Sequence, residues 1–462
     1  MPLSVVTESD SESMYLGVGV ADAITTRLAN TRQVAVRPTA AVLPFKDAQS
    51  NPARIASLLH VRHLLLGSIQ RTQHTYRITL QLVDRDGVAV WGRTFDEPHA
   101  AFPQLQDHIA EQVVAALRVE LSPPERARLH VRYTTNPAVY DLYLRGRSLL
   151  LNYTEDNMRL AIRHFEEALR LDENYALARA GIATAAAWFS VRYAHQEEAI
   201  AWAKRADEEA RRALEQDASL ADAHLAIANA AGTTYGGFDW KKVLEGTATA
   251  LALDPSLDLA HAARMRAFYH LGLLPEAIEE GRRARALNPN PSVEVDRLRV
   301  VLQMLTGQYA SAVKEAEDLL PRTDASAIRQ YHGLAKFYTG DAAAARTILE
   351  SIVRDGRADE RAQSSLASIE AAVGMRDQAR ARIAAVLLAP EQDHHVAYSL
   401  GAAFAQLGDA DASVMWLERA ANTGFPCYPW FERDSLLDPV RRDSRFVQLI
   451  ERMRSAYQQS RR

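Results

Sequence analysis

The sequence of 462 residues contains little of several residue types that would define a function. Its one cysteine, Cys427, excludes an intramolecular disulfide and a zinc site made of cysteine ligands. Only six of its 54 basic residues are lysine, and a net charge of −4 offers no basic surface for nucleic acid. No apolar run approaches the roughly 20 residues of a membrane-spanning helix. We therefore expect a chain without a membrane span and without a nucleic-acid partner.

An export signal is also missing from the sequence. The apolar start at residues 1–6 turns polar at Thr7, too early for the apolar core of a signal peptide. As written, the chain is expected to be cytoplasmic; as part of a membrane-spanning regulator it would lie outside the cytoplasm. The composition, 48% hydrophobic and 24% charged, is that of a globular protein and excludes overall disorder.

Up to about residue 130, helix and strand patterns alternate along the chain. The spacing of apolar residues predicts helices over 14–28, 52–59 and 105–117. Tyr76, Ile78, Leu80 and Leu82 alternate with polar residues, as in a half-buried strand, and the next residues reach an Asp-Gly hairpin turn. The expected strands are 33–37, 61–69, 76–82 and 88–95. Residues 1–130 should thus form a small α/β domain with two or three adjacent antiparallel strands.

From about residue 138 onward every pattern is helical, and the pattern repeats. Five glycines recur at intervals of 33 to 35 residues: Gly272, Gly307, Gly340, Gly374 and Gly408. Five residues after each glycine comes an alanine or a serine. A repeat that keeps one register predicts stacked units of equal construction.

These features resemble the tetratricopeptide repeat family. Its pattern places a glycine between two antiparallel helices, a small residue early in the second helix, and Asp-Pro at the end, as in Asp254-Pro255. The resemblance implies a mainly α fold, with a solenoid of about eight helix pairs at 138–422 preceded by the small α/β domain. The second helices are expected to start near eight positions: Ala161, Ala206, Val243, Ala277, Ala312, Ala345, Ala379 and Ser413.

The residues after the repeats break the period. A solenoid has an open apolar end that must be covered, and Trp430, Phe431, Leu436 and Leu437 are the candidates for this cover. A last helix is expected at 444–457. We therefore assign 423–462 as a C-terminal capping segment and helix.

The first domain resembles a second family, the TolB-type amino-terminal-like domain. The resemblance rests on residues 16–24 (LGVGVADAI), 36–39 (VRPT), 66–71 (LGSIQR), Trp91 and 95–96. In bacterial signalling proteins this domain lies between an effector and tetratricopeptide repeats. The effectors are CadC-type winged-helix regulators, serine/threonine kinases or nucleotide cyclases. The sequence itself contains no such effector.

No arrangement of residues points to catalysis or to a bound cofactor. Gly17 and Gly19 lack the third glycine of a dinucleotide-binding turn. His394 and His395 are adjacent, so on a helix they should point about 100° apart and not share a metal ion. Cys427 is expected to be a small packed residue rather than a nucleophile. We therefore assign no catalytic, cofactor-binding or metal-binding residue, no cofactor, and no enzymatic activity.

The candidate site is the groove that the repeat resemblance implies, lined by the first helix of each repeat. Carrying the family's groove positions over to this sequence gives eight candidate partner-binding residues: Arg266, Tyr269, Arg297, Met304, Gln330, Phe337, His395 and Tyr398. Arg266 and Arg297 would together clamp a carboxylate of the partner.

The resulting interpretation is a non-catalytic protein-interaction or sensory module of a bacterial signalling or transcription-regulatory system. It would bind a protein or peptide in the groove. Two alternatives stay open: a detached C-terminal half of a winged-helix regulator, kinase or cyclase, and an enzyme with its active site in the groove. The sequence names neither the partner nor the effector nor the oligomeric state.

Overall fold

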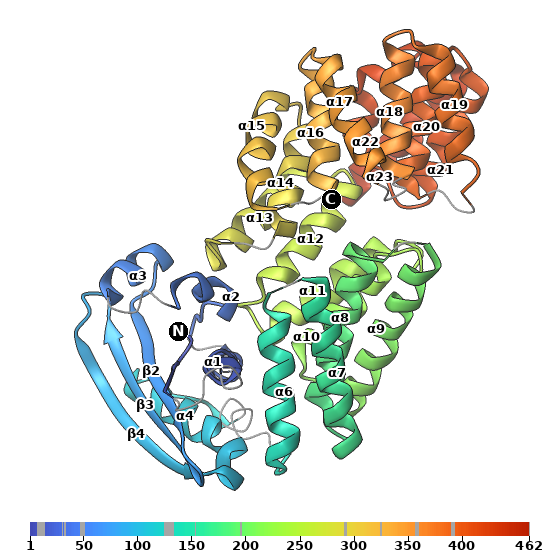
Figure 1. The fold of residues 1–462 in the computed structure, drawn as a ribbon. Helices are drawn as coiled ribbons and strands as arrows, with labels where there is room; N and C mark the ends of the chain where they lie inside the picture. The colour runs from blue at the N-terminus through green and yellow to red at the C-terminus, as the bar shows by residue number, and fades with distance from the viewer. Residues whose placement is uncertain are drawn as a thin grey trace. The chain divides into compact units, whose positions relative to one another are not determined.

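The computed structural model describes residues 1–6, 14–29, 31, 34–46, 51–123, 134–152, 154–194, 196–290, 293–323, 326–355, 360–389 and 393–461. No helix within these ranges has both the length and the apolar character needed to cross a bilayer. The chain divides into two compact units, the first made of 1–235, 242–261 and 283–291, and the second of 236–241, 262–282 and 292–462 (Figure 1).

A mixed sheet opens the first unit. Among the described residues it has four strands in the order β1 (Ser4–Val6), β2 (His63–Arg71), β3 (Thr75–Asp84) and β4 (Ala89–Pro98). β1 pairs with β2 in parallel, whereas β2, β3 and β4 are joined as antiparallel neighbours. The three antiparallel strands agree with the sequence prediction.

The alternation along β3 determines which face of the sheet is buried. Tyr76, Ile78, Leu80 and Leu82 are each at most 5% exposed. The helices α1 (Met14–Ala29) and α4 (Phe102–Ala116) share a core with this face. On the other side, Leu64 of β2 packs with residues of the short elements α2 (Thr39–Val42), η1 (Leu43–Phe45) and α3 (Pro52–Leu59). A further short turn, η2 (His99–Ala101), leads from the sheet into α4.

The strand expected at 33–37 is wrong for residues 34–37, which form no strand; Gln33 lies outside the described residues. The run is short, and Pro38, which has no N–H to donate to a ladder, ends it. The edge of β2 where a further strand could pair is occupied by β1. Arg37 instead donates its Nε–H to the carbonyl oxygen of Leu59 at 2.9 Å.

Eight successive helix pairs follow within the described part of the chain, which confirms the mainly α repeat fold after a small α/β domain. The pairs are α6 (Pro137–Leu150) and α7 (Glu155–Leu171); α8 (Ala176–Arg192) and α9 (Gln196–Gln216); α10 (Ala221–Ala231) and α11 (Trp240–Leu253); α12 (Asp258–His270) and α13 (Leu274–Leu287); α14 (Val293–Leu305) and α15 (Tyr309–Leu319), followed by η3 (Leu320–Arg322); α16 (Ser326–Tyr338) and α17 (Ala342–Arg354); α18 (Glu360–Ala372) and α19 (Arg376–Val386); α20 (His394–Leu407) and α21 (Ala410–Asn422).

The repeat residues have the roles that their spacing predicts. The five recurring glycines adopt φ between +77° and +93°, a left-handed conformation that only glycine enters at no steric cost. The residues at the eight positions predicted near the starts of the second helices, seven of them alanine or serine and one of them Val243, are all fully buried. Two of these helices begin well before the predicted positions: α7 starts at Glu155, where the Thr154 side chain caps it, and α9 starts at Gln196.

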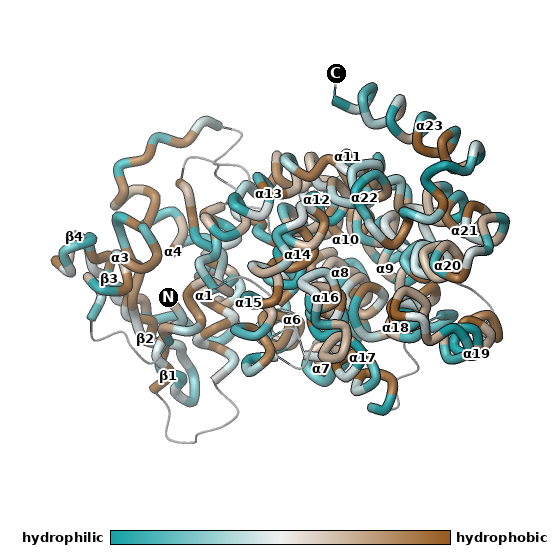
Figure 2. The backbone as a smooth tube through the Cα atoms, turned by 90° about the horizontal axis from the view of Figure 1, so that it is seen from above, coloured by the Kyte–Doolittle hydropathy of each residue, from teal (hydrophilic) through white to brown (hydrophobic). Residues whose placement is uncertain are grey.

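Three elements follow the repeats in the second unit: α22 (Tyr428–Arg433), η4 (Ser435–Val440) and α23 (Ser444–Ser460). Trp430, Phe431, Leu436 and Leu437 are buried in one core with side chains of α20 and α21. The hydrophobic and hydrophilic residues of α23 alternate along its tube (Figure 2), as expected for a helix with one buried side.

The compact units do not end at the domain boundaries expected from the sequence. In the first unit, side chains of the sheet and of α6, α7 and α8 belong to the same core, including Phe95, Tyr140, Phe165 and Phe189. The predicted domains 1–130, 138–422 and 423–462 follow from the change of sequence pattern near residue 130 and from the end of the repeats. This division stays a prediction.

Candidate functional site

In the second unit, α14, α16, α18 and α20 are the first helices of their pairs and contact one another in that order, forming what we call the inner face. Residues 424–440, here named the tail segment, lie against this face. Arg433 donates to the carbonyl oxygen of Leu305 on α14 at 2.9 Å. The carboxylate of Asp434 accepts hydrogen bonds from Tyr338 of α16 at 2.7 Å and from Tyr398 of α20 at 2.5 Å. The tail segment therefore spans several repeats rather than only the last one.

A cavity of about 60 Å³ lies between the inner face and the tail segment. This is room for about four to six water molecules, or for one large side chain. The helices contribute mostly apolar and aromatic side chains to its walls, and the tail segment contributes three more. The lining residues include Tyr269, Met304, Gln330, Tyr331, Ser368, His395, Tyr398, Ala402, Phe425, Trp430 and Leu436.

Five of the eight residues predicted for the groove line this cavity: Tyr269, Met304, Gln330, His395 and Tyr398. They come from four different helices, α12, α14, α16 and α20, which the fold brings to one cavity. The other three, Arg266, Arg297 and Phe337, do not line it. Phe337 packs both against the large core of the second unit and against a smaller core that contains Leu349 and Ile352.

Arg297 already has a carboxylate partner within the chain. Its Nε and Nη2 atoms donate to the two carboxylate oxygens of Glu294 at 2.9 and 2.7 Å, and both side chains are mostly buried. Burial lowers the pKa of Arg297, but the Glu294 charge outweighs it and holds that pKa above its usual value. The pKa of Arg266 is lowered by burial, with Glu294 acting against the shift. The carboxylate expected from a partner is thus supplied by Glu294, whose i,i+3 spacing from Arg297 was a visible signal.

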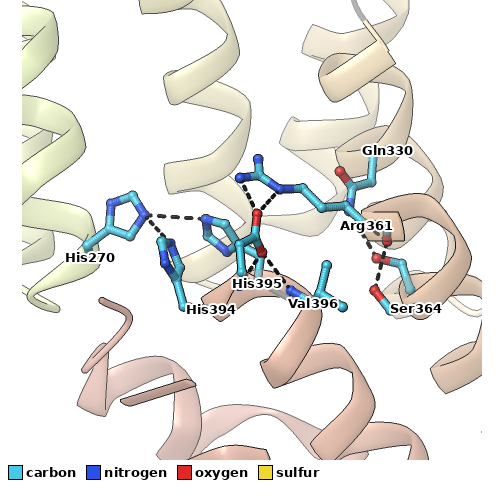
Figure 3. Close-up of polar contacts among 9 residues, drawn as sticks. His270, Gln330, Arg361, Ser364, His394, His395 and Val396 are labelled. Carbon is cyan, nitrogen blue, oxygen red and sulfur yellow. Dashed lines mark hydrogen bonds and ion pairs between the residues drawn. The ribbon is translucent and has the colours of Figure 1, made fainter. Parts of the chain in front are cut away.

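A polar network fixes the start of α20 at the edge of the cavity (Figure 3). Asp393 accepts hydrogen bonds from the backbone N–H groups of His395 and Val396, both at 2.9 Å, and so caps the helix. Arg361 of α18 pairs with the same carboxylate at 2.5 Å. Gln330 of α16 donates to the Arg361 carbonyl oxygen at 3.2 Å. Three repeats therefore hold the two histidines of α20 in place.

The Nε2 atoms of three histidines converge beside this network. The Nε2 atom of His270, the last residue of α12, lies 3.1 Å from that of His394 and 3.3 Å from that of His395 (Figure 3). We call these residues the three-histidine cluster; their ligand atoms all lie within 4.8 Å of one another. The expectation that His394 and His395 diverge is wrong. Their backbone positions differ by a turn of about 100°, but both side chains reach toward the same ring.

Burial disfavours the charged form of all three imidazoles of the cluster. Burial lowers the pKa of His394 to about 4 and lowers the pKa values of His270 and His395 well below their usual range. Aromatic rings surround the imidazoles: Trp240 stacks on His270 at 4.1 Å between ring centroids, and Phe238 meets His394 edge-on at 4.4 Å. Spacing along the chain could not predict the third histidine, because His270 precedes His394 by 124 residues.

Cys427, also in the tail segment, is fully buried. Burial raises the pKa of its thiol to about 12, which keeps it protonated near neutral pH. Its burial agrees with the prediction of a small packed residue.

The first unit contains a second, larger cavity, of about 150 Å³, that sequence reasoning missed. Arg147 lies on its wall and pairs with Asp22 at 2.8 Å and Asp222 at 2.9 Å. Asp254 and Asp258 also line it, and burial raises the pKa values of both. Arg147 therefore has two carboxylate partners on the wall of this cavity.

No family model matches the chain. A segment of 174 residues, 37% of this chain, is 28% identical to the protein named “Putative adenylate cyclase 3” of Rhizobium meliloti (strain 1021). The match spans 30% of that relative's length.

Three solved structures are similar to parts of this chain at low identity. A tetratricopeptide repeat protein of Parabacteroides merdae is 13% identical with a TM-score of 0.33, over 66% of this chain and 99% of that one. PilF of Pseudomonas aeruginosa is 17% identical with a TM-score of 0.33, over 48% and 96%. Human IFIT1 is 13% identical with a TM-score of 0.42, over 69% and 77%.

Proposed function

We propose that this chain is a non-catalytic interaction and sensory module of a bacterial signalling system, and that its cavity binds one apolar or aromatic side chain of a protein or peptide. One observation carries the proposal: five residues picked from the sequence as partner-binding line a single cavity. The small α/β domain that precedes the repeats would be of the TolB type, as its sequence suggests.

The chemistry of the cavity supports an apolar anchor with few polar contacts. Met304, Leu436 and Trp430 supply apolar walls. The Nε2 group of Gln330 donates to Ser365 Oγ at 3.0 Å and to a backbone carbonyl oxygen at 3.2 Å, so its two N–H groups are already used within the chain. Binding sites of this kind gain affinity from burial of one large side chain in a preformed pocket.

The tail segment bears on how a partner would bind. Phe425, Trp430 and Leu436 form one wall of the cavity, so the tail segment takes the place that a bound peptide takes on the inner face of a repeat array. A partner would insert its side chain beside these residues and add to this wall. It would not meet an open, empty groove.

The signalling assignment draws on the relative from Rhizobium meliloti, which is named as an adenylate cyclase. The name of this relative favours a cyclase-type system over the winged-helix and kinase alternatives. Because the match spans 30% of that protein, we assign this chain to a regulatory part of such a system. Under this proposal the chain passes on a binding event and carries out no reaction of its own, has no nucleic-acid partner, and acts in the cytoplasm unless it belongs to a membrane-spanning regulator.

A peptide-display selection on the purified chain tests the binding proposal. Selected peptides are then titrated against the wild-type chain, against Ala402→Met, which fills the cavity, and against Ala384→Met. Ala402 is buried at the cavity wall, whereas Ala384 is exposed on α19 and serves as the matched control. Thermal melting checks that each variant folds, and Ser368→Leu is a second filling variant.

We expect the selected peptides to share one large apolar residue. Ala402→Met should weaken their binding at least tenfold, about 1.4 kcal/mol, and Ala384→Met should leave it unchanged. Equal binding by all folded variants would move the site away from the cavity. A selection that enriches no peptide would contradict the interaction function itself.

A further inference from the structure

Two nitrogen–nitrogen distances in the three-histidine cluster match those of a tetrahedral metal site, and all three ligand atoms lie within 4.8 Å of one another. In a tetrahedral zinc site with Zn–N bonds of 2.0–2.1 Å, ligand nitrogens lie about 3.3–3.4 Å apart. The Nε2 atoms of His270 and His394 are 3.1 Å apart, and those of His270 and His395 are 3.3 Å apart. We propose that His270, His394 and His395 bind a divalent transition metal ion through their Nε2 atoms, with Zn²⁺ as the preferred ion.

The hydrogen bond at the far side of His270 determines its tautomer. Its Nδ1 atom lies 2.7 Å from the carbonyl oxygen of Arg266, and a carbonyl oxygen only accepts. Nδ1 therefore carries the proton, and the Nε2 lone pair points toward the other two histidines. A ring N–H held by a backbone carbonyl is the usual support of a metal-ligating histidine.

Hydrogen bonds alone account poorly for this arrangement. A neutral imidazole has one acceptor nitrogen, and that of His270 faces two other ring nitrogens at hydrogen-bond distance. Its single lone pair can accept one good hydrogen bond, which leaves the third ring poorly paired in a buried place. A cation shared by three lone pairs would satisfy the three Nε2 atoms at once.

The surroundings support the ligands. Asp393 caps α20 and pairs with Arg361, which fixes the turn that carries His394 and His395. Trp240 stacks on His270 and donates its indole N–H to the carbonyl oxygen of Gly424 at 2.7 Å. These contacts orient the rings before any ion arrives, so binding would need little rearrangement.

The donor set indicates the class of metal. Three imidazoles suit Zn²⁺, Cu²⁺, Ni²⁺ and Co²⁺, whereas Ca²⁺ and Mg²⁺ prefer oxygen ligands. The part of the chain that the structure describes contributes three ligands to the cluster, which leaves at least one coordination position for water. The proposal goes beyond the interaction function and does not depend on it.

The test uses the full chain after removal of metal with a chelator. Zn²⁺ is titrated by calorimetry, and Co²⁺ is added to give visible absorption bands that report its geometry. We expect one ion per chain and intense bands of tetrahedral Co²⁺. His270→Gln and His395→Gln should each weaken binding by at least tenfold. His74→Gln, at an exposed position in the first unit, is the matched control and should bind like the wild type.

A second measurement needs no variant. X-ray absorption at the zinc edge of the loaded wild-type chain should show imidazole nitrogens at 2.0–2.1 Å. No stoichiometric Zn²⁺ binding by the wild type would overturn the proposal. So would equal binding by wild type and His270→Gln, or a zinc shell without imidazole.

Discussion

The Nε2 atoms of His270 and His394 lie 3.1 Å apart although 124 residues separate them. One histidine ends α12 and the other begins α20, and both belong to the second unit. The tail segment supplies the carbonyl of Gly424 to Trp240, which stacks on His270. The inner face of the repeats is therefore connected to distant parts of the same unit through named contacts, and these contacts can be tested one at a time.

The first prediction concerns the anchor of the tail segment. Tyr398→Phe removes a hydrogen bond to the buried carboxylate of Asp434 and changes nothing else in the side chain. Because hydrogen bonds to charged groups contribute about 1.5–3 kcal/mol, the free energy of unfolding should fall by about that amount. Tyr457→Phe, on partly exposed α23, is the control and should change stability by less than about 0.5 kcal/mol. Urea unfolding measures both, and equal effects of the two substitutions would refute the anchoring role.

The second prediction concerns pH. Burial raises the pKa of Asp434 above its usual 3.8, while the hydrogen bonds from Tyr398 and Tyr338 act in the other direction. The folded state therefore holds the Asp434 proton more tightly than the unfolded state does. This contribution to stability is fully present below pH 3.8 and is lost as the pH rises through the folded pKa.

The comparison of wild type with Asp434→Asn isolates this effect, because the asparagine does not titrate. The free energy of unfolding of wild type minus that of the variant should fall as the pH rises above about 4. Unfolding in urea at a series of pH values gives this difference. A difference that stays constant, or that grows with pH, would show that the pKa of Asp434 is not raised.

The third prediction concerns Arg297 and Glu294. Arg297→Ala would remove the bidentate partner of the buried Glu294 carboxylate, and breaking a buried ion pair typically costs about 3–5 kcal/mol. The chain offers a matched control, the Arg282–Glu279 pair, which has the same i,i+3 spacing and a distance of 2.7 Å but is largely exposed. Arg282→Ala should therefore cost less than about 1 kcal/mol. Thermal melting of the two variants decides, and similar losses would mean that burial of the first pair does not matter.

The sequence was sufficient for the features that depend on local spacing. The alternation along Tyr76–Leu82 identified β3, and the five recurring glycines identified turns whose φ angles only glycine adopts easily. The same register placed Tyr269, Met304 and Tyr398 at one cavity. Each of these features follows from a period that is fixed by the geometry of a strand or of a repeat.

The remaining features depend on contacts between distant residues, which spacing does not encode. The tail segment breaks the period, so its position across α14, α16 and α20 left no trace in the register. The three-histidine cluster forms because the end of α12 lies beside the start of α20. From the sequence, two adjacent histidines on a helix are expected to point in different directions. The Glu294–Arg297 pair was visible as a spacing, but its burial was not.

The central claim is that the cavity under the tail segment receives a side chain of a partner. Amide hydrogen exchange of the full chain, measured with and without a selected peptide, tests this claim most directly. We predict slower exchange on peptide addition in α18, in α20 and in residues 424–440, where Ser368, Ala402 and Trp430 line the cavity. Protection confined to the second helices of the pairs, such as α17 and α19, or to residues of the first unit, would contradict the account.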